Sequence, residues 1–240
     1  VSIDGKEQFL ELTDKYLPFK ALPSSLYHAN ALVISFDKAE NEKSKIIAIP
    51  FDNALKNIAT SSSVVSIDEK SKNFVNTFTV QGANKSYYNE LFSEATTEDV
   101  RKKKIEEDYN AKLKKVVTLQ SSKIIKNETY DKDITFETQF TVSERIQTVG
   151  NLKITDVPLL DKVYTRDIIA LETRKYDIDY YSYETSNEYQ SEVVINIPAD
   201  KKFTEVPESK TLAYKGHNYQ ITFELVKPNS LKVVRKVTLN

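Results

Sequence analysis

Few residues in this 240-residue chain have the chemistry that catalysis requires. There is no cysteine, which excludes a thiolate nucleophile, a thiolate metal site and disulfide bonds. The two histidines, His28 and His217, lie far apart in the sequence, and no G-x-S-x-G motif accompanies the many serines. Counting residues does not exclude a Ser-His-Asp site, but no motif points to one.

Two pairs of aspartates could offer oxygen ligands to a cation. They are Asp131 with Asp133 and Asp177 with Asp179. Calcium needs about six to eight oxygen ligands, and neither pair has EF-hand spacing or a glycine beside it. The four glycines are too widely spaced to form a phosphate-binding loop. The sequence therefore predicts no cofactor and no metal site.

The densest aromatic stretch runs from Tyr176 to Tyr189. Exposed tyrosines with acidic neighbours could bind glycans, and Tyr180, Tyr183 and Tyr189 are the candidate residues for such a surface. Tyrosine is also a strong strand former whose ring can cover one side of a sheet. We favour this second interpretation.

The overall charge argues against polyanionic partners. The chain has 34 Lys and Arg against 35 Asp and Glu, so no net field would attract nucleic acid or an acidic membrane. No apolar run approaches the roughly 18 residues that span a bilayer. Because the chain begins at Val1 without a methionine or a signal peptide, we expect it to be a piece of a longer protein.

The elements that must position these residues are mostly strands. Apolar residues predict strands in residues 26–36 and 43–51, and a polar break at Thr60–Ser63 follows. Two further strands flank a charged turn at Asp68–Lys72. In the second of these, alternation places one set of side chains on a buried face, namely Phe74, Phe78 and Val80.

One region, residues 83–116, predicts helix, with a break near Ser93–Thr97. Thr96 and Asp99 approximate a capping box, and the helix is expected to run to about Lys115. Its buried stripe is predicted to comprise Val100, Ile105, Tyr109 and Leu113. The basic run Arg101–Lys104 is followed by acidic residues, which indicates a solvated face with weak ion pairs.

Strands return after the helix. Two are predicted around a turn at Glu128–Asp133, and an irregular segment follows from Lys153 to Ile169. A second domain, or the second half of one sheet system, begins there. The chain ends in a predicted hairpin around Lys227–Ser230, in which Tyr219, Ile221, Phe223 and Leu225 oppose Leu231, Val233 and Arg235. His217 is expected to lie in a solvent-exposed loop.

These patterns predict a mainly β fold with one longer helix, an α+β arrangement of antiparallel sheets in sandwich-like units. The expected divisions are residues 1–23, 24–152 with the helix near 97–115, and 153–240.

The first of these divisions is dominated by the stretch from Ile3 to Pro23. Alternation of Phe9, Glu11 and Thr13 with their neighbours predicts a strand entered through an Asp4-Gly5 turn. Pro18 and Pro23 would prevent further pairing.

This stretch also resembles the segment that closes the catalytic domain in secreted bacterial transglutaminase-like proteins. That segment has the form DGKxYFLDxTDKxxPFGxLP. The matching positions here are Asp4, Gly5, Lys6, Phe9, Leu10, Thr13, Asp14, Lys15, Pro18, Phe19, Leu22 and Pro23.

Two later segments are similar to the same family. Glu172–Tyr180 resembles a turn of the form ExRKYPVDF, with Asp177 in place of the proline. The C-terminal positions that fit the family's β domain are Ile197, Pro198, Pro207, Ser209, Tyr219, Leu231, Val233, Arg235 and Leu239. The order of the three matches is more specific than any one of them.

The resemblance implies a parent protein with a papain-like core that uses a Cys-His-Asp triad. Glu11 stands where the triad acid would be, and the cysteine and histidine would lie upstream. A glutamate can orient the imidazole only if its additional methylene is accommodated. A polar strand residue facing solvent is an equally good interpretation of Glu11.

Two functions follow as hypotheses. The first is a non-catalytic accessory region of a periplasmic or extracellular transglutaminase-like protein, which positions the upstream catalytic domain or binds a surface protein or glycan. The second is a carbohydrate-binding or cell-surface-binding module that uses the tyrosines. A third hypothesis is that the parent protein is an inactive pseudoenzyme in which Glu11 has replaced the triad acid. Only the upstream sequence could test it.

Overall fold

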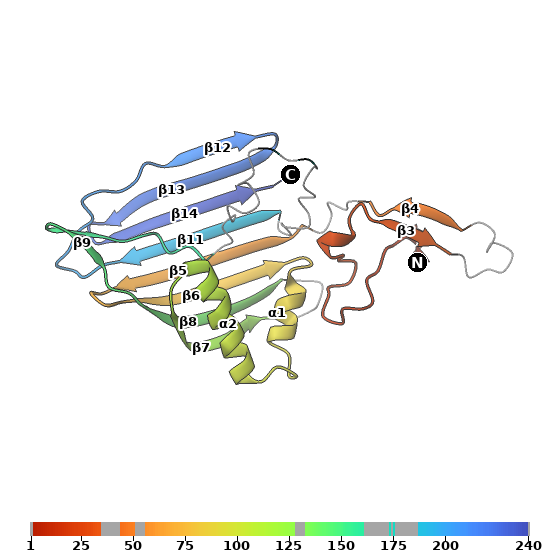
Figure 1. The fold of residues 1–240 in the computed structure, drawn as a ribbon, viewed down its shortest axis with the longest axis horizontal. Coiled ribbons are helices and arrows are strands. Elements are labelled where there is room, and N and C mark those ends of the chain that lie inside the picture. Colours follow the sequence, from red (N-terminus) through yellow and green to blue (C-terminus); the bar gives the residue numbers. More distant parts are fainter. Residues whose placement is uncertain are drawn as a thin grey trace.

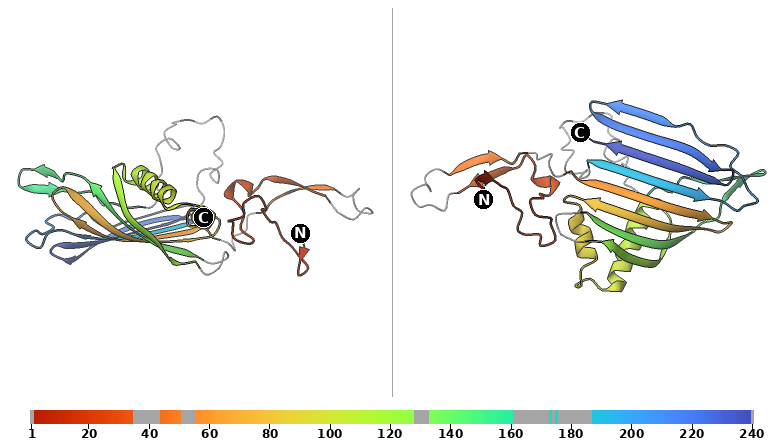
Figure 2. Two further views of the ribbon diagram at one scale, coloured as in Figure 1. Left: turned by 90° about the horizontal axis from the view of Figure 1, so that it is seen from below. Right: turned by 180° about the vertical axis from the view of Figure 1, so that it is seen from behind.

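The computed structural model describes residues 2–34, 44–50, 56–127, 133–160, 173, 175 and 187–239. Most of the regular structure is one eight-stranded sheet in the order β12-β13-β14-β11-β5-β6-β8-β7, with helix α2 over one face (Figures 1 and 2). The predicted fold class, mainly β with one longer helix and antiparallel pairing in a layered packing, is confirmed.

The elements of the large sheet and its helices have the following bounds. The strands are β5 Ile58–Ile67, β6 Ser71–Gln81, β7 Val117–Lys126, β8 Ile134–Ser143, β11 Glu188–Asn196, β12 Lys210–Tyr214, β13 His217–Lys227 and β14 Ser230–Thr238. The helices are α1 Lys85–Leu91 and α2 Glu98–Leu113. Smaller elements are β1 Ser2–Ile3, β2 Lys6–Glu7, a 3-10 turn Ser24–Leu26, β3 Asn30–Val33, β4 Lys45–Ala48, β9 Gln147–Val149 and β10 Leu152–Ile154.

The sheet is built from antiparallel ribbons joined by one parallel pair. β5 and β6 form a hairpin, the two helices follow, and β7 and β8 form a second hairpin whose strand β8 pairs with β6. After β10 the chain returns as β11, which pairs parallel with β5 on one side and antiparallel with β14 on the other. Strands from residues 24–152 and from residues 153–240 therefore share one sheet.

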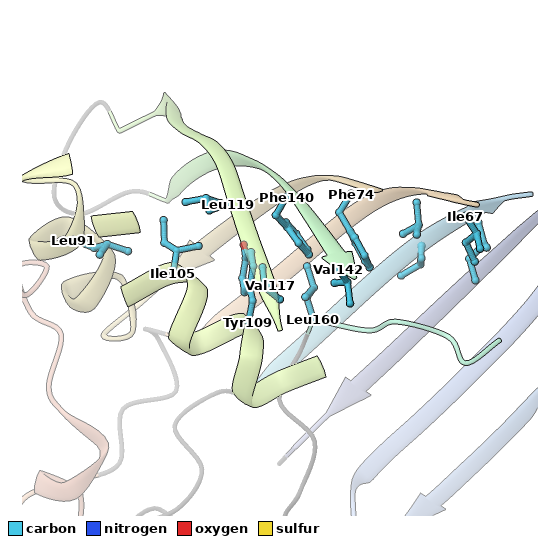
Figure 3. Close-up of a cluster of buried hydrophobic side chains, with 13 residues drawn as sticks. Ile67, Phe74, Leu91, Ile105, Tyr109, Val117, Leu119, Phe140, Val142 and Leu160 are labelled. Carbon is cyan, nitrogen blue, oxygen red and sulfur yellow. The ribbon is translucent and has the colours of Figure 1, made fainter. Parts of the chain in front are cut away.

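The core lies between α2 and the inward face of this sheet. The rings of Phe74 and Phe140 stack at 4.3 Å between centroids, and Tyr109 of α2 approaches Phe140 at 4.8 Å (Figure 3). The face predicted from Phe74, Phe78 and Val80 is buried, which confirms the alternation in β6.

The predicted polar break at Thr60–Ser63 is wrong. These residues lie within β5, where Ser61 and Ser63 point into the core and are almost fully buried. Their hydroxyls are accommodated because both donate to Asn76 of β6. A satisfied hydroxyl can occupy a position where alternation otherwise requires an apolar side chain.

Helix α2 forms where the sequence predicts it, but its cap is displaced by one residue. Thr97, not Thr96, is the N-cap, and its hydroxyl accepts from the Val100 N–H at 3.4 Å. Ile105 and Tyr109 are buried as predicted, whereas Val100 is 46% exposed. The predicted buried stripe is wrong at Val100, because this residue lies in the first turn of α2, beyond the part of the helix that packs on the sheet.

The strand predicted from Phe9, Glu11 and Thr13 is wrong. The Asp4-Gly5 turn is present between β1 and β2, but residues 8–23 contain no strand. Asp14 explains the difference, because its carboxylate accepts from the Tyr16 N–H at 2.9 Å and its carbonyl accepts from the Leu17 N–H at 3.2 Å. Local turns of this kind compete with extended pairing.

The predicted C-terminal hairpin is present as β13 and β14, with Phe223 opposite Val233, Leu225 opposite Leu231 and one register shift between Leu225 and Lys227. The strand before it, β12, was not predicted. It pairs with β13 through a two-residue turn, and His217 is consequently the first residue of β13 and not a loop residue.

The stacked phenylalanines provide a test of this core. Phe140→Ala should lower the free energy of unfolding by about 3–5 kcal/mol, because it removes a fully buried ring from between β6 and α2. Denaturant unfolding followed by circular dichroism measures this loss. Phe19→Ala, at a ring that is 54% exposed, should cost about 0.5 kcal/mol or less. Equal losses in the two variants would contradict this placement of the core.

Candidate functional site

A small cavity lies between the helices and the inward face of the sheet. It is lined by residues of α1, α2, β6 and β8 together with Leu160, namely Asn76, Phe78, Tyr87, Tyr88, Leu91, Ile105, Asp108, Tyr109, Lys112, Phe136 and Leu160. Its volume is about 10 Å³, close to the space that one water molecule needs. Small-molecule sites usually measure about 300–1,000 Å³. This cavity is too small for a substrate.

A buried polar network borders the cavity. Asn76 Oδ1 accepts from the hydroxyls of Ser61 and Ser63, both at 2.8 Å, and Asn76 Nδ2 lies 3.4 Å from Tyr109 Oη. Tyr109 Oη in turn lies 3.0 Å from Thr138 Oγ1. The network thus links β5, β6 and β8 to α2 within an apolar core.

This network has no nucleophile activated by a base. Burial raises the pKa of Tyr109 to about 12, although its hydrogen bonds with Thr138 and Asn76 act in the opposite direction. Tyr109 is therefore protonated at neutral pH. The hydroxyls of Ser61 and Ser63 donate to an amide oxygen, which does not remove their protons. The arrangement suits a structural role.

A second polar cluster lies near the turn between β5 and β6. Lys72 is buried and pairs with Glu144 at 3.1 Å and with Asp156, while Lys115 pairs with Glu144 at 3.0 Å. Partial burial opposes ionisation of both carboxyl groups. The hydrogen bonds from Lys115 and Lys72 to Glu144, and from Lys72 to Asp156, outweigh it and lower both pKa values. Lys72 thereby ties residues 144 and 156 to the sheet.

The N-terminal segment is attached to helix α1. Asp14 accepts from the Ser86 hydroxyl, the Tyr16 carbonyl accepts from Asn89 Nδ2 at 2.9 Å, and the Tyr16 hydroxyl donates to Ser93 Oγ at 3.1 Å. Asn89 is almost fully buried. Residues 14–16 therefore have a defined position against the helical layer.

Glu11 has no contact with an imidazole. Its carboxylate accepts from the backbone N–H and the hydroxyl of Thr13, and these hydrogen bonds lower its pKa. A triad acid must instead accept from the catalytic histidine. The two histidines lie on separate elements, His28 in the turn before β3, where its N–H donates to the Ile49 carbonyl, and His217 at the start of β13.

Of the three candidate tyrosines, one lies among the described residues. Tyr189 of β11 points inward, is 8% exposed, and belongs to a buried cluster with Phe78 and Phe136. Tyr180 and Tyr183 lie outside the described residues, as do Asp131, Asp177 and Asp179. Asp133 pairs with Lys126 at 3.0 Å.

Within the described ranges, no three His, Cys, Asp or Glu residues lie close enough together to hold a metal ion. In the same part of the chain, no helix combines the length and the apolar character needed to cross a membrane.

Sequence analysis placed Tyr109 on the buried helical stripe but missed Asn76 and Lys72, the central residues of the two polar clusters. The sequence predicts Lys72 in a charged turn, whereas it is the first inward residue of β6 before Phe74. Asn76 continues the same period, between Phe74 and Phe78. A polar residue inside an alternating apolar row is the signal that could have found both.

Because Asn76 is the centre of the buried network, replacing it should destabilise the folded protein. Asn76→Leu should lower the free energy of unfolding by about 1–3 kcal/mol, because the buried hydroxyls of Ser61 and Ser63 lose their acceptor. Denaturant unfolding measures this loss. Asn73→Leu, on the outward face of β6, is the matched control and should change stability little. A neutral Asn76→Leu would contradict the network.

The Lys72 cluster predicts a dependence of stability on pH. Glu144 and Asp156 have lowered pKa values in the folded state, so their contribution is present above their unfolded values of about 4.5 and 3.8. It is lost as the pH falls through the lowered folded values. Lys72→Met should flatten this acid-side loss, measured by denaturant unfolding between about pH 2 and pH 7. Lys103→Met, at an exposed pair with Glu107, should leave the profile unchanged; identical profiles for both variants would refute the assignment.

Comparisons with protein families, with curated proteins and with solved structures found no match to this chain.

Proposed function

We propose that this chain is a non-catalytic accessory region that holds the end of a preceding transglutaminase-like domain against its own helical layer. The observation that carries the proposal is the attachment of residues 14–16 to α1. These residues belong to the stretch that resembles the end of the family's catalytic domain. In a parent protein, a fixed exit from that domain would fix its position relative to the sheet.

Burial along the same stretch supports a docked segment. Pro18, Ala21 and Leu22 are buried, although residues 8–23 contain no strand. Irregular backbone that buries its side chains and bonds to a neighbouring helix is held by those contacts. The segment therefore acts as a positioned connection between domains.

The described residues also support a role without catalysis. The cavity beneath the helices is water-sized, the hydroxyls of the buried network lack a base, and Glu11 bonds to Thr13. A function through surfaces is the simplest one compatible with these features. Binding of a surface protein or glycan, and a periplasmic or extracellular location, belong to the same proposal and rest on the resemblance alone.

Loosening the attachment tests the proposal. Asn89→Ala removes the amide that donates to Tyr16, so amide hydrogen exchange in residues 8–22 should accelerate about two- to tenfold while exchange in β6 and β8 stays unchanged. Mass spectrometry of the full chain measures both. Asn73→Ala, the same substitution on the outward face of β6, should have no effect on this segment.

Two results would overturn the proposal. Unchanged exchange in Asn89→Ala would mean that α1 does not hold the segment. Turnover of a peptide or glutaminyl substrate by the purified chain would refute the non-catalytic assignment.

A further inference from the structure

The two edge strands of the eight-stranded sheet, β7 and β12, differ in how well they are protected against the addition of another strand. At the β7 edge, the N–H groups of Val117 and Leu119 donate to Asn110 Oδ1 at 2.7 Å and to Glu106 Oε1 at 2.8 Å, both from α2. β7 also has two register shifts against β8. Side chains that bind edge N–H groups, and bulges that twist the edge, both prevent another strand from adding. This edge is closed.

In the described part of the chain, the β12 edge has no such protection. Among the described residues no strand pairs with its outer side, and its pairing with β13 contains no register shift. All five residues are exposed, including Leu212 at 65% and Tyr214 at 68%. A regular exposed edge with large apolar side chains is a template for strand addition.

The turn between β12 and β13 determines which backbone groups face outward. Lys215 and Gly216 both have positive φ, 45° and 87°, as in a type I′ turn. Such a turn makes Tyr214 and His217 a hydrogen-bonded pair, and alternate residues repeat this pattern toward Lys210. The N–H and C=O groups of Thr211 and Ala213 therefore point away from β13.

We propose that this edge is an interface with a second copy of the same chain, formed by antiparallel pairing of the two β12 strands about a two-fold axis at Leu212. Thr211 of each copy then exchanges hydrogen bonds with Ala213 of the other, using the outward groups. The two Leu212 side chains lie directly opposite each other. An interface of this kind is closed and uses the same patch twice.

The charge of β12 permits a second copy as the occupant. In this register Lys210 lies opposite Tyr214 of the other copy and never opposite its own counterpart, so no like charges are directly opposed in the strand pair. Leu212 and Tyr214 share a face with Tyr219 of β13, which extends the apolar row across the junction. Five residues on each side bury less than the roughly 1,200 Å² of a stable complex, so we expect a dimer that dissociates on dilution.

The absence of native cysteine makes cross-linking a direct test. Leu212→Cys introduces a single thiol at the axis, where directly opposed residues lie about 4.5–5.5 Å apart, within disulfide range. Mild oxidation of the full chain should give a covalent dimer on non-reducing gels. Lys210→Cys is the matched control and should not cross-link, because its position faces Tyr214 of the other copy.

Proline provides a second test that leaves β13 pairing intact. Thr211→Pro removes an outward N–H, so sedimentation velocity should show a monomer at concentrations where the unchanged chain associates. Thr211→Val keeps the N–H and should still associate. Circular dichroism shows whether both variants are folded. If Thr211→Pro does not fold, the comparison of cross-linking by Leu212→Cys and Lys210→Cys is the test of the interface.

The proposal fails if the unchanged chain is monomeric at the highest concentration attainable, or if Leu212→Cys and Lys210→Cys cross-link equally. It also fails if association survives Thr211→Pro in a folded protein. None of these outcomes bears on the attachment of residues 14–16 to α1.

Discussion

The pairing of β5 with β11 is the interaction on which the rest of the structure depends. It is parallel, with residues 58–66 opposite residues 188–196, and it joins two four-stranded antiparallel halves into one sheet. Ser61 and Ser191 are opposite each other and almost fully buried. Without this pairing, both strands would become exposed edges, and Tyr189 and Val193 would lose their neighbours on β5. The layered core requires both halves.

The fold was predictable where its signals are local. β13 and β14 lie on either side of a short turn, and their alternation predicts both the hairpin and the residues that share a face, although not the register shift between Leu225 and Lys227. The parallel β5–β11 pair joins segments far apart in the sequence, and no pattern within either strand specifies its partner. In residues 9–14 alternation predicted a strand, but the hydrogen bonds of Asp14 favour turns.

The polar clusters were harder to predict than the fold. Tyr109 was expected to be buried from its place on the helical stripe, but its partners Asn76 and Thr138 come from strands that only the tertiary structure brings together. The same holds for Lys72, whose partner Asp156 lies beyond β10. Lys72, Asn76 and Thr138 are polar residues at inward strand positions that an apolar side chain could fill. Their roles depend on satisfying one another.

Directed hydrogen bonds, more than apolar burial, fix the position of helix α2. Only Ile105 and Tyr109 of its sixteen residues are fully buried, so the apolar stripe alone would tolerate sliding along the sheet. Tyr109 reaches the network, and Glu106 and Asn110 bind the β7 backbone. These bonds require one register between helix and strand. The same contacts that place the helix therefore cover the start of the β7 edge, whereas β12 has a regular edge at which we propose that another strand adds.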